Sequence, residues 1–320
     1  MRGINCCALL LALLTASQVC AQSYPNKPIR LVLPYPPGGG TDVIARPLAQ
    51  KLTENLGQQV IVDNSGGANG NIGMEFVAKS PPDGYTLLFA LSAQFAVNPS
   101  LYPKLPYDPV RDYAPISLLA NAPYLLIVHP SLPVKSVPEL LAFVKQRPGQ
   151  LAYSSAGNGS GAHLAGEMLR SLARVNFVHV PYKGIGLAMP DLIAGQVQLS
   201  FVTYTAAGPH VKTGRLRALG VTTAKRSPTL PDLPAIAESV PGYDSAVWYG
   251  FAAPAGTPGE TVARLNSEVL RVLAAPDFRS RIMLEAVAPI GSTAEEFGSF
   301  IRSEIARWAQ VVKDSGAKVD

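Results

Sequence analysis

The chain has 320 residues, 48% of them hydrophobic, and a formal net charge of +5. This length and apolar content provide material for two ordinary hydrophobic cores, so we expect two lobes rather than one. Lys and Arg are scattered and form no run, which argues against nucleic-acid binding. A mildly positive surface either attracts anionic solutes or simply keeps the protein soluble.

The first 21 residues have the pattern of an export signal. Arg2 supplies positive charge, residues 8–14 form a short apolar run, and residues 19–21 form a small-residue cleavage site before Gln22. The apolar run is too short to span a bilayer as an anchor. We therefore expect residues 1–21 to be removed and the mature protein to be periplasmic.

All three cysteines, Cys6, Cys7 and Cys20, lie within this leader. The mature protein then has no thiol, which excludes a disulfide framework, a cysteine nucleophile and a thiolate metal site. The histidines are dispersed, and no carboxylate–histidine spacing joins them. They are His129, His163, His179 and His210. We therefore expect neither a metal nor a cofactor.

The elements expected along the chain alternate between short strands and longer helices. Strands are predicted at residues 29–33, 60–63, 86–90, 124–129, 151–155, 177–181, 197–202, 216–222 and 248–253. Helices are predicted at residues 41–56, 72–80, 137–146, 161–172, 186–194, 257–274, 277–284 and 294–314. Ser292 and Thr293, followed by Glu295 and Glu296, are typical of a capped start for the last helix. This alternation predicts an α/β fold with mostly parallel sheets covered on both faces.

Two glycine-rich turns each join a predicted strand to a predicted helix, at Gly38–Asp42 and at Gly157–Gly161. Such a turn leaves unpaired backbone N–H groups at the positive end of a helix, where an anion can bind. A tight turn alone would also explain the glycines. Two such turns about half a chain apart predict two lobes that hold one small acid between them.

Two further predicted strands end in small polar residues, at 92–94 and 203–205. In open α/β sheets ligands bind beyond the carboxyl ends of the strands, so these loops and the two glycine turns should line one cleft. The chain has natural crossing points at 121–124 and 245–249. We therefore predict one lobe from residues 22–123 with 246–320, and a second from residues 124–245.

The motifs of the chain resemble those of one receptor family along nearly its whole mature length. In the first half they are Pro34-Tyr-Pro-Pro-Gly-Gly-Gly-Thr-Asp42, Gly70-Asn-Ile-Gly73, Pro82-Asp-Gly-Tyr-Thr-Leu87 and Asn98-Pro-Ser-Leu-Tyr102. In the second half they are Ser154-Ser-Ala-Gly-Asn-Gly-Ser160, Val178-His-Val-Pro-Tyr-Lys-Gly184 and Pro254-Ala-Gly-Thr-Pro258. The sequence is similar to the Bug-type extracytoplasmic solute receptors of tripartite tricarboxylate transporters.

The resemblance implies a two-lobed periplasmic binding protein of the type II, or flytrap, class. Such a receptor closes on a small carboxylate, catalyses nothing, acts as a monomer and delivers its ligand to the membrane subunits of a transporter. Loop N–H groups, neutral side chains and water hold the ligand. The residues predicted to bind it are Tyr35, Gly38, Gly39, Gly40, Thr41, Asp42, Ser92, Gln94, Ser155, Ala156, Gly157, Asn158, Gly159, Ser160, His163, Thr203 and Tyr204.

Several of these residues also have structural interpretations. Asp42 would repel an anion in the cleft, and a helix-start pair with Arg46 explains it better. His163 either donates to the anion or packs beside Tyr153. Lys183 is either solvated or closes a salt bridge between the lobes. Trp248 is either a pocket wall or part of the core.

The chain departs from the family pattern at Thr203, where many relatives carry an acid. This favours a plain, hydroxylated or aromatic carboxylate over an amino acid. A serine hydrolase using Ser155 or Ser160 with His163 remains an alternative, although no G-x-S-x-G turn is present. A receptor that serves only a sensory system is another. A dinucleotide site at Gly157–Ala162 lacks the acid that should end the next strand.

Overall fold

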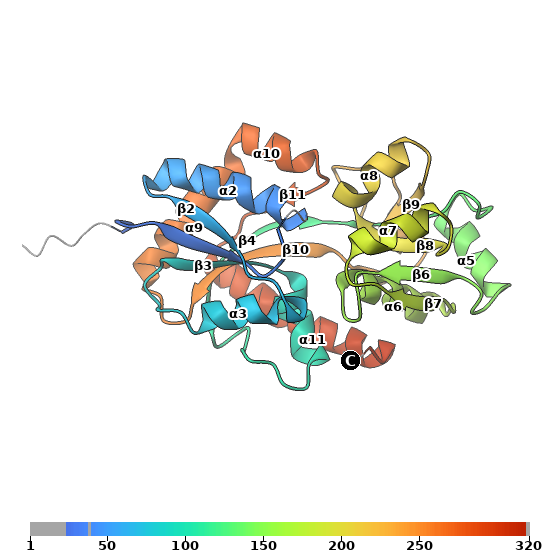
Figure 1. Ribbon diagram of the computed structural model, residues 1–320, viewed down its shortest axis with the longest axis horizontal. Helices are drawn as coiled ribbons and strands as arrows, with labels where there is room; N and C mark the ends of the chain where they lie inside the picture. Colours follow the sequence, from blue (N-terminus) through green and yellow to red (C-terminus); the bar gives the residue numbers. More distant parts are fainter. Residues whose placement is uncertain (1–23, 38–39, 318–320) are drawn as a thin grey trace, which may run out of the picture.

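The computed structural model describes residues 24–37 and 40–317. The expected export signal and the turn residues Gly38 and Gly39 lie outside the described residues. Within the described part, the chain forms two sheets, each with its own helices, which stand side by side in Figure 1. The prediction of a two-lobed α/β fold is confirmed.

The first sheet has the strand order β11-β4-β10-β3-β1-β2. Its strands are β1 (Ile29–Leu33), β2 (Val60–Asn64), β3 (Thr86–Leu91), β4 (Tyr113–Ala122), β10 (Val247–Pro254) and β11 (Ala288–Pro289). Its helices are α2 (Gly40–Leu56), α3 (Asn71–Ala78), α4 (Asn98–Leu101), α9 (Gly259–Ala274), α10 (Pro276–Met283) and α11 (Ala294–Ser315). Helices α2, α9 and α10 bury apolar side chains on one face, while α3 and α11 cover the other (Figure 1).

The second sheet has the strand order β7-β6-β8-β5-β9. Its strands are β5 (Tyr124–Val128), β6 (Ala152–Ser155), β7 (Val178–Pro181), β8 (Leu199–Thr203) and β9 (Arg217–Val221). Its helices are α5 (Val137–Lys145), α6 (Gly161–Ala173), α7 (Ile185–Ile193) and α8 (Tyr204–Lys212). Helices α5 and α6 contribute to the core on one face, and α7 and α8 to the core on the other.

Both sheets are mixed, although most of their strands run in one direction. In the described chain four of the six strands of the first sheet share a direction, as do four of the five in the second. The internal strands that run the opposite way are β10 and β5, which adjoin the segments between the sheets. The reversal follows from the chain leaving one sheet and returning to it.

The sequence did not predict strand β4, because Pro115 lies within it and proline cannot donate to a ladder. The structure accommodates Pro115 opposite Ala252, beside a register shift between β4 and β10. Helix α8 was also missed. Residues 203–205 were expected to form a loop, but Thr203 precedes α8 and Tyr204 is its first residue. Gly208 and Pro209 lower the helix propensity of this segment, so the sequence did not predict the helix.

Side-chain caps begin two of the helices, and the one at α11 was predicted from the sequence. Thr293 Oγ1 accepts from Glu296 N at 3.2 Å, and Thr293 N donates back to Glu296 Oε2 at 2.8 Å, which forms a capping box at α11. Ser160 Oγ accepts from His163 N at 3.2 Å at the start of α6. Each such cap stabilises its helix by about 1 kcal/mol.

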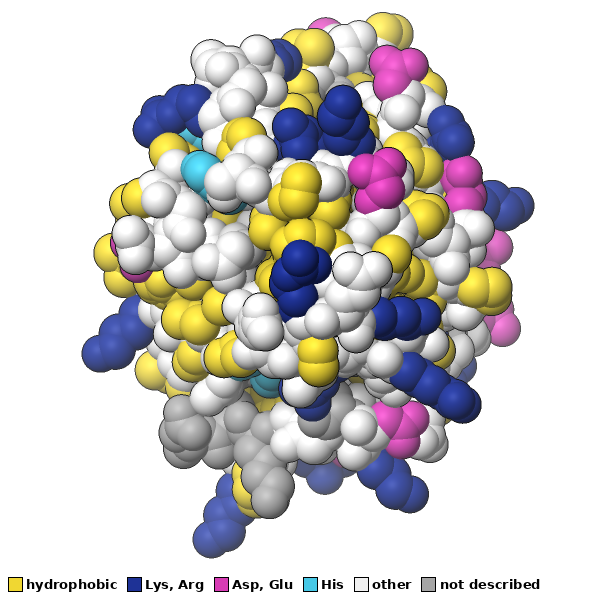
Figure 2. Space-filling view, turned by 90° about the vertical axis from the view of Figure 1, so that its right-hand side faces the viewer, with side chains coloured by type: hydrophobic (Ala, Val, Ile, Leu, Met, Phe, Trp, Pro, Cys, Tyr) yellow, Lys and Arg dark blue, Asp and Glu magenta, His cyan; other side chains and the backbone are white. Residues whose placement is uncertain are grey.

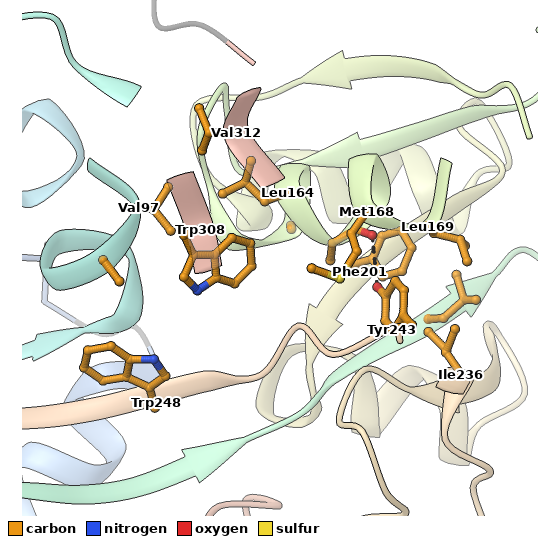
Figure 3. Packing of buried hydrophobic residues seen from close by; sticks show 14 of the residues in the cluster. Val97, Leu164, Met168, Leu169, Phe201, Ile236, Tyr243, Trp248, Trp308 and Val312 are labelled. Carbon is orange, nitrogen blue, oxygen red and sulfur yellow. Dashed lines mark hydrogen bonds between the residues drawn. The ribbon is translucent and has the colours of Figure 1, made fainter. Parts of the chain in front are cut away.

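Helix α11 belongs to the first lobe but also reaches the second. Its side chains Trp308 and Val312 lie near Leu164 of α6 and Val97 of the first lobe (Figure 3). One buried cluster therefore extends through both lobes. None of the described helices is long and apolar enough to cross a membrane.

The chain passes between the sheets at two places. It leaves β4 at Ala122 and enters β5 at Tyr124, and it returns between Val221 and Val247. Thr222 joins the two passages: its Oγ1 accepts from Tyr124 N at 2.8 Å, and its carbonyl accepts from Ser245 N at 2.8 Å. The two passages therefore form one hydrogen-bonded unit.

Candidate ligand-binding site

Two adjoining chambers lie between the lobes. The large chamber has a volume of about 390 Å³ and the small chamber about 180 Å³. Leu91, Tyr124, Ala156 and Ser160 line both. The remaining lining comes from the loops after β1, β2, β3 and β7, the starts of α2, α6 and α7, the end of β8, helix α11 and the passages between the sheets. The cleft therefore gathers segments from both lobes.

Seven residues predicted to bind the ligand line these chambers. They are Tyr35, Gly40, Thr41, Ser92, Ala156, Ser160 and Thr203. Another eight lie outside the lining: Asp42, Gln94, Ser155, Gly157, Asn158, Gly159, His163 and Tyr204. Several of these eight hold the cleft loops in place instead.

Asp42 has the structural role that its position at a helix start suggested. The Arg46 Nε atom lies 2.8 Å from Asp42 Oδ1, one helical turn along α2. The Asn64 amide lies 3.5 Å from the same carboxylate. Asp42 is buried and does not line either chamber, so its charge is paired within the protein.

Gln94 is fully buried behind the wall of the large chamber. Its Oε1 accepts from Leu91 N at 3.1 Å, and its Nε2 donates to the Asn69 carbonyl at 2.8 Å and to the Tyr35 hydroxyl. Asn69 and Tyr35 both line the chamber. Gln94 therefore positions two wall residues through its side-chain amide.

Two stacked histidines hold the second glycine turn. The rings of His163 and His179 lie 4.0 Å apart and nearly parallel. His163 Nδ1 accepts from Gly159 N at 2.9 Å, and His179 Nε2 lies 2.7 Å from Ser155 Oγ, which accepts from Gly157 N at 3.1 Å. These bonds engage the Gly157 and Gly159 amides, so the turn's shape is set by protein groups.

Burial lowers the pKa of His163 to about 3 and that of His179 to about 4. The second cause for His163 is the neighbouring His179, and Arg170 lowers the pKa of both. Both rings are therefore neutral at neutral pH. Since Nδ1 of His163 accepts a hydrogen bond, its proton lies on Nε2.

The start of α6 supplies the N–H groups that remain. Gly161 lines the large chamber and Ala162 the small one. No described residue accepts a hydrogen bond from either of their backbone N–H groups. These groups lie at the positive end of a 13-residue helix, where the chambers meet, and such donors are chemically suited to an anion.

Other lining residues were missing from the predicted set. Tyr124, Tyr249 and Trp308 line the chambers, and Lys183 is the one charged side chain in the lining that the structure describes. Trp248, offered as a wall residue, instead stacks on Phe95 in the core. The tyrosines lie in the segments predicted as crossing points and Trp308 lies on a helix remote from the glycine motifs, so no local pattern marked any of them as a lining residue.

Neither Ser155 nor Ser160 pairs with the ring of His163, although the hydrolase alternative requires such a pair. Ser155 is fully buried and outside both chambers, and its hydroxyl is engaged by Gly157 N and His179. Ser160 Oγ caps α6 by accepting a hydrogen bond from the backbone N–H of His163, not from the His163 ring. The described residues contain no group of His, Cys, Asp or Glu that could hold a metal ion.

Comparisons with known proteins agree with this architecture. Protein BugT of Bordetella pertussis is 39% identical over 308 residues, covering 95% of this chain and 94% of BugT. The structure of R. palustris Rpa4515 with adipate has a TM-score of 0.85 and 39% identity, covering 92% of this chain and 99% of that one. MatC of Rhodopseudomonas palustris, solved with malate, has a TM-score of 0.80 and 31% identity, covering 90% and 100%.

The family described as "Tripartite tricarboxylate transporter family receptor" matches residues 44–317, which is most of the chain. The match includes both passages between the sheets, the second glycine turn and helix α11. The protein therefore belongs to the receptor family of the tripartite tricarboxylate transporters.

Proposed function

We propose that this protein is an exported receptor that captures a small organic carboxylate between its lobes and delivers it to a tripartite transporter. One observation carries the proposal: the start of α6, with the N–H groups of Gly161 and Ala162, opens where the two chambers meet. A buried carboxylate needs several strong donors, and helix starts provide them.

The charges in the lining favour an anion without an amine. Lys183 lines the large chamber, and no described Asp or Glu side chain lines either one. An amino-acid ligand would leave its ammonium group without a carboxylate partner. Thr203 lies in the small chamber, where the family pattern often has an acid. The neighbours solved with adipate and malate support an uncharged or hydroxylated acid body.

Ligand-driven closure is the proposed mechanism. The lobes are taken as residues 22–123 with 246–320 and residues 124–245, with the paired passages at Thr222 acting as the hinge. Because the chambers are lined from both lobes, an acid gains contacts in the closed form that one open lobe cannot supply. The receptor works in the periplasm as a monomer, with transporter membrane subunits as partners and with no catalytic step.

Lys and Arg outnumber Asp and Glu between residues 124 and 245. Figure 2 looks onto the end of the molecule formed by this lobe, and Lys and Arg side chains are spread over it with fewer Asp and Glu. This distribution helps to draw an anion toward the cleft before the lobes close.

A thermal-shift screen tests the proposal. The chain starting at Gln22 is mixed with acetate, benzoate, succinate, malate, adipate and citrate, and with the matching neutral amides. A bound acid at 100 times its Kd stabilises the protein by about 2.7 kcal/mol, so an acid should raise the melting temperature while its amide does not. Equal shifts for acids and amides, no shift for any acid, or turnover of added esters would contradict the proposal.

A further inference from the structure

Two tyrosines adjoin the passages between the lobes and line the cleft. Tyr124 begins β5 and lines both chambers, while Tyr249 lies on β10 and lines the small chamber. Tyr249 is only 4% exposed. Both residues lie in the segments predicted as crossing points between the lobes, but neither belongs to a glycine turn or to the residues predicted to bind the ligand.

The hydroxyls of these two residues differ from most buried tyrosine hydroxyls of the protein. Tyr153 Oη donates to Glu167 at 2.7 Å, Tyr113 Oη to the Met74 carbonyl at 2.8 Å and Tyr243 Oη to the Ala165 carbonyl at 2.9 Å. No described residue forms a hydrogen bond with the hydroxyl of Tyr124 or Tyr249. Neither hydroxyl is among the fully buried, unpartnered polar atoms of the described residues, and both tyrosines line the chambers, so a ligand or water in the cleft can supply the missing partner.

The Tyr124 hydroxyl lies directly against the first residue of α6. A Cβ atom at position 161 would overlap Tyr124 Oη, so only glycine lets the hydroxyl reach this helix start. The Gly161 and Ala162 N–H groups lie at the same place. Three donors from two elements therefore converge at the meeting point of the chambers.

Both phenols remain protonated and can donate. Burial raises the pKa of Tyr124 and of Tyr249, and the neighbouring Tyr124 raises that of Tyr249 further. The small chamber is also lined by apolar residues, among them Ile185, Phe201, Val202 and Val247, and by the hydroxyl residues Thr41, Ser160 and Thr203. None of these lining residues accepts a hydrogen bond from either tyrosine hydroxyl, so a ligand oxygen in the chamber can be the acceptor.

We propose that Tyr124 and Tyr249 are ligand-binding residues that donate hydrogen bonds to oxygen atoms of the bound acid. Tyr124 donates to the carboxylate at the start of α6, and Tyr249 donates to an acceptor oxygen of the same acid in the small chamber. The inference rests on the proposed carboxylate-binding function. It gives the strands next to the passages a direct contact with the ligand.

Isothermal titration calorimetry of Tyr124→Phe and Tyr249→Phe tests this assignment. The probe is whichever acid of the screen above gives the wild type its largest thermal shift. Loss of one hydrogen bond to a charged group should raise Kd about 10- to 100-fold. The melting temperature without acid should stay unchanged or rise, because the lost hydroxyl has no protein partner.

Tyr102→Phe is the matched control. Tyr102 is partly buried, its hydroxyl forms no hydrogen bond with a described residue, and it lines neither chamber. Its Kd should remain within twofold of the wild type. If the wild type binds but both cleft variants also stay within twofold, the inference fails while the proposed function stands. Weaker binding with a lower melting temperature without acid would assign the hydroxyls a structural role and overturn the inference. If no acid binds the wild type, the proposed function fails first, and the inference with it.

Discussion

At the scale of single residues, Gly159 shows how one position can serve both the turn and the contact between lobes. Its φ of 75° is in the left-handed region, which favours glycine. A Cβ atom there would overlap the side chain of Leu101, which belongs to α4 of the first lobe. The second glycine turn is therefore shaped to approach the opposite lobe as well as to start a helix.

Replacing Gly159 by alanine should weaken ligand binding. The left-handed backbone costs an L-residue about 1–2 kcal/mol, and the overlap with Leu101 opposes the close approach of the lobes. We expect at least a tenfold higher Kd by calorimetry. Gly186→Ala is the control, since it lies in α7 with open space around its Cα and should bind normally. Unchanged affinity of the Gly159 variant would show that this approach is dispensable.

The neutral His163 should make stability depend on pH. Its pKa of about 3 in the folded protein lies below the ordinary value of 6.5, so the unfolded chain takes up the proton first. The contribution of His163 is therefore complete above pH 6.5 and is lost as the pH falls toward 3. The charged groups near the ring are Glu167 and Arg170, which pair at 2.8 Å, and its stacked neighbour is His179.

Urea unfolding of the wild type and of His163→Asn between pH 7 and pH 4 checks this expectation. The Asn side-chain oxygen can still accept from Gly159 N, but it does not titrate. As the pH falls, the free energy of unfolding of the wild type should decrease more than that of the variant. Parallel pH curves would mean that His163 is not held neutral by the fold.

At the scale of elements, Thr222 determines how the two passages stay together. It is fully buried, and its hydroxyl is the acceptor for Tyr124 N at the start of β5. Its backbone bonds to Tyr124 on one side and to Ser245 on the other. The strands next to the proposed hinge are thus joined through one residue, although they lie far apart in the sequence.

Thr222→Val should destabilise the protein by about 1–3 kcal/mol, because the buried Tyr124 N–H loses its acceptor while the side-chain volume is kept. Chemical denaturation measures this change. Thr205→Val on α8 is the control, since its hydroxyl has no hydrogen bond to a described residue, and it should change stability by less than about 0.5 kcal/mol. Equal effects of the two substitutions would show that the hydrogen bond from Tyr124 N to Thr222 does not contribute specially to stability.

At the scale of the whole molecule, α11 connects the cleft with the first lobe and reaches the second. The tryptophans of the chain, Trp248 and Trp308, share one buried acceptor: Glu304 Oε2 lies 2.8 Å from the first indole nitrogen and 3.2 Å from the second. Trp308 lines the large chamber, whereas Trp248 does not. The proposed ligand-driven closure would therefore change the surroundings of Trp308 more directly than those of Trp248.

Ligand binding should change the fluorescence of Trp308 more than that of Trp248. Titration of Trp248→Phe with a binding acid is expected to keep the wild-type spectral change, because Trp308 lies where the lobes meet. Trp308→Phe should lose most of the change. Calorimetry on both variants separates a lost signal from lost binding. If the spectral change were lost in Trp248→Phe and kept in Trp308→Phe, the prediction that Trp308 reports ligand binding would be wrong.

Local signals in the sequence determined most of the secondary structure and the fold class of this protein. Glycine turns, capping residues such as Thr293 and alternating apolar runs act within a few residues, so they predicted most strands and helices, the two lobes and the family. Tertiary structure decided the rest. The pairing of β4 around Pro115, the engagement of the Gly157 and Gly159 amides, and the arrival of Tyr124, Tyr249 and Trp308 at one cleft all depend on segments far apart in the chain. Their positions follow from how the sheets and α11 pack together, and no local pattern encodes that packing.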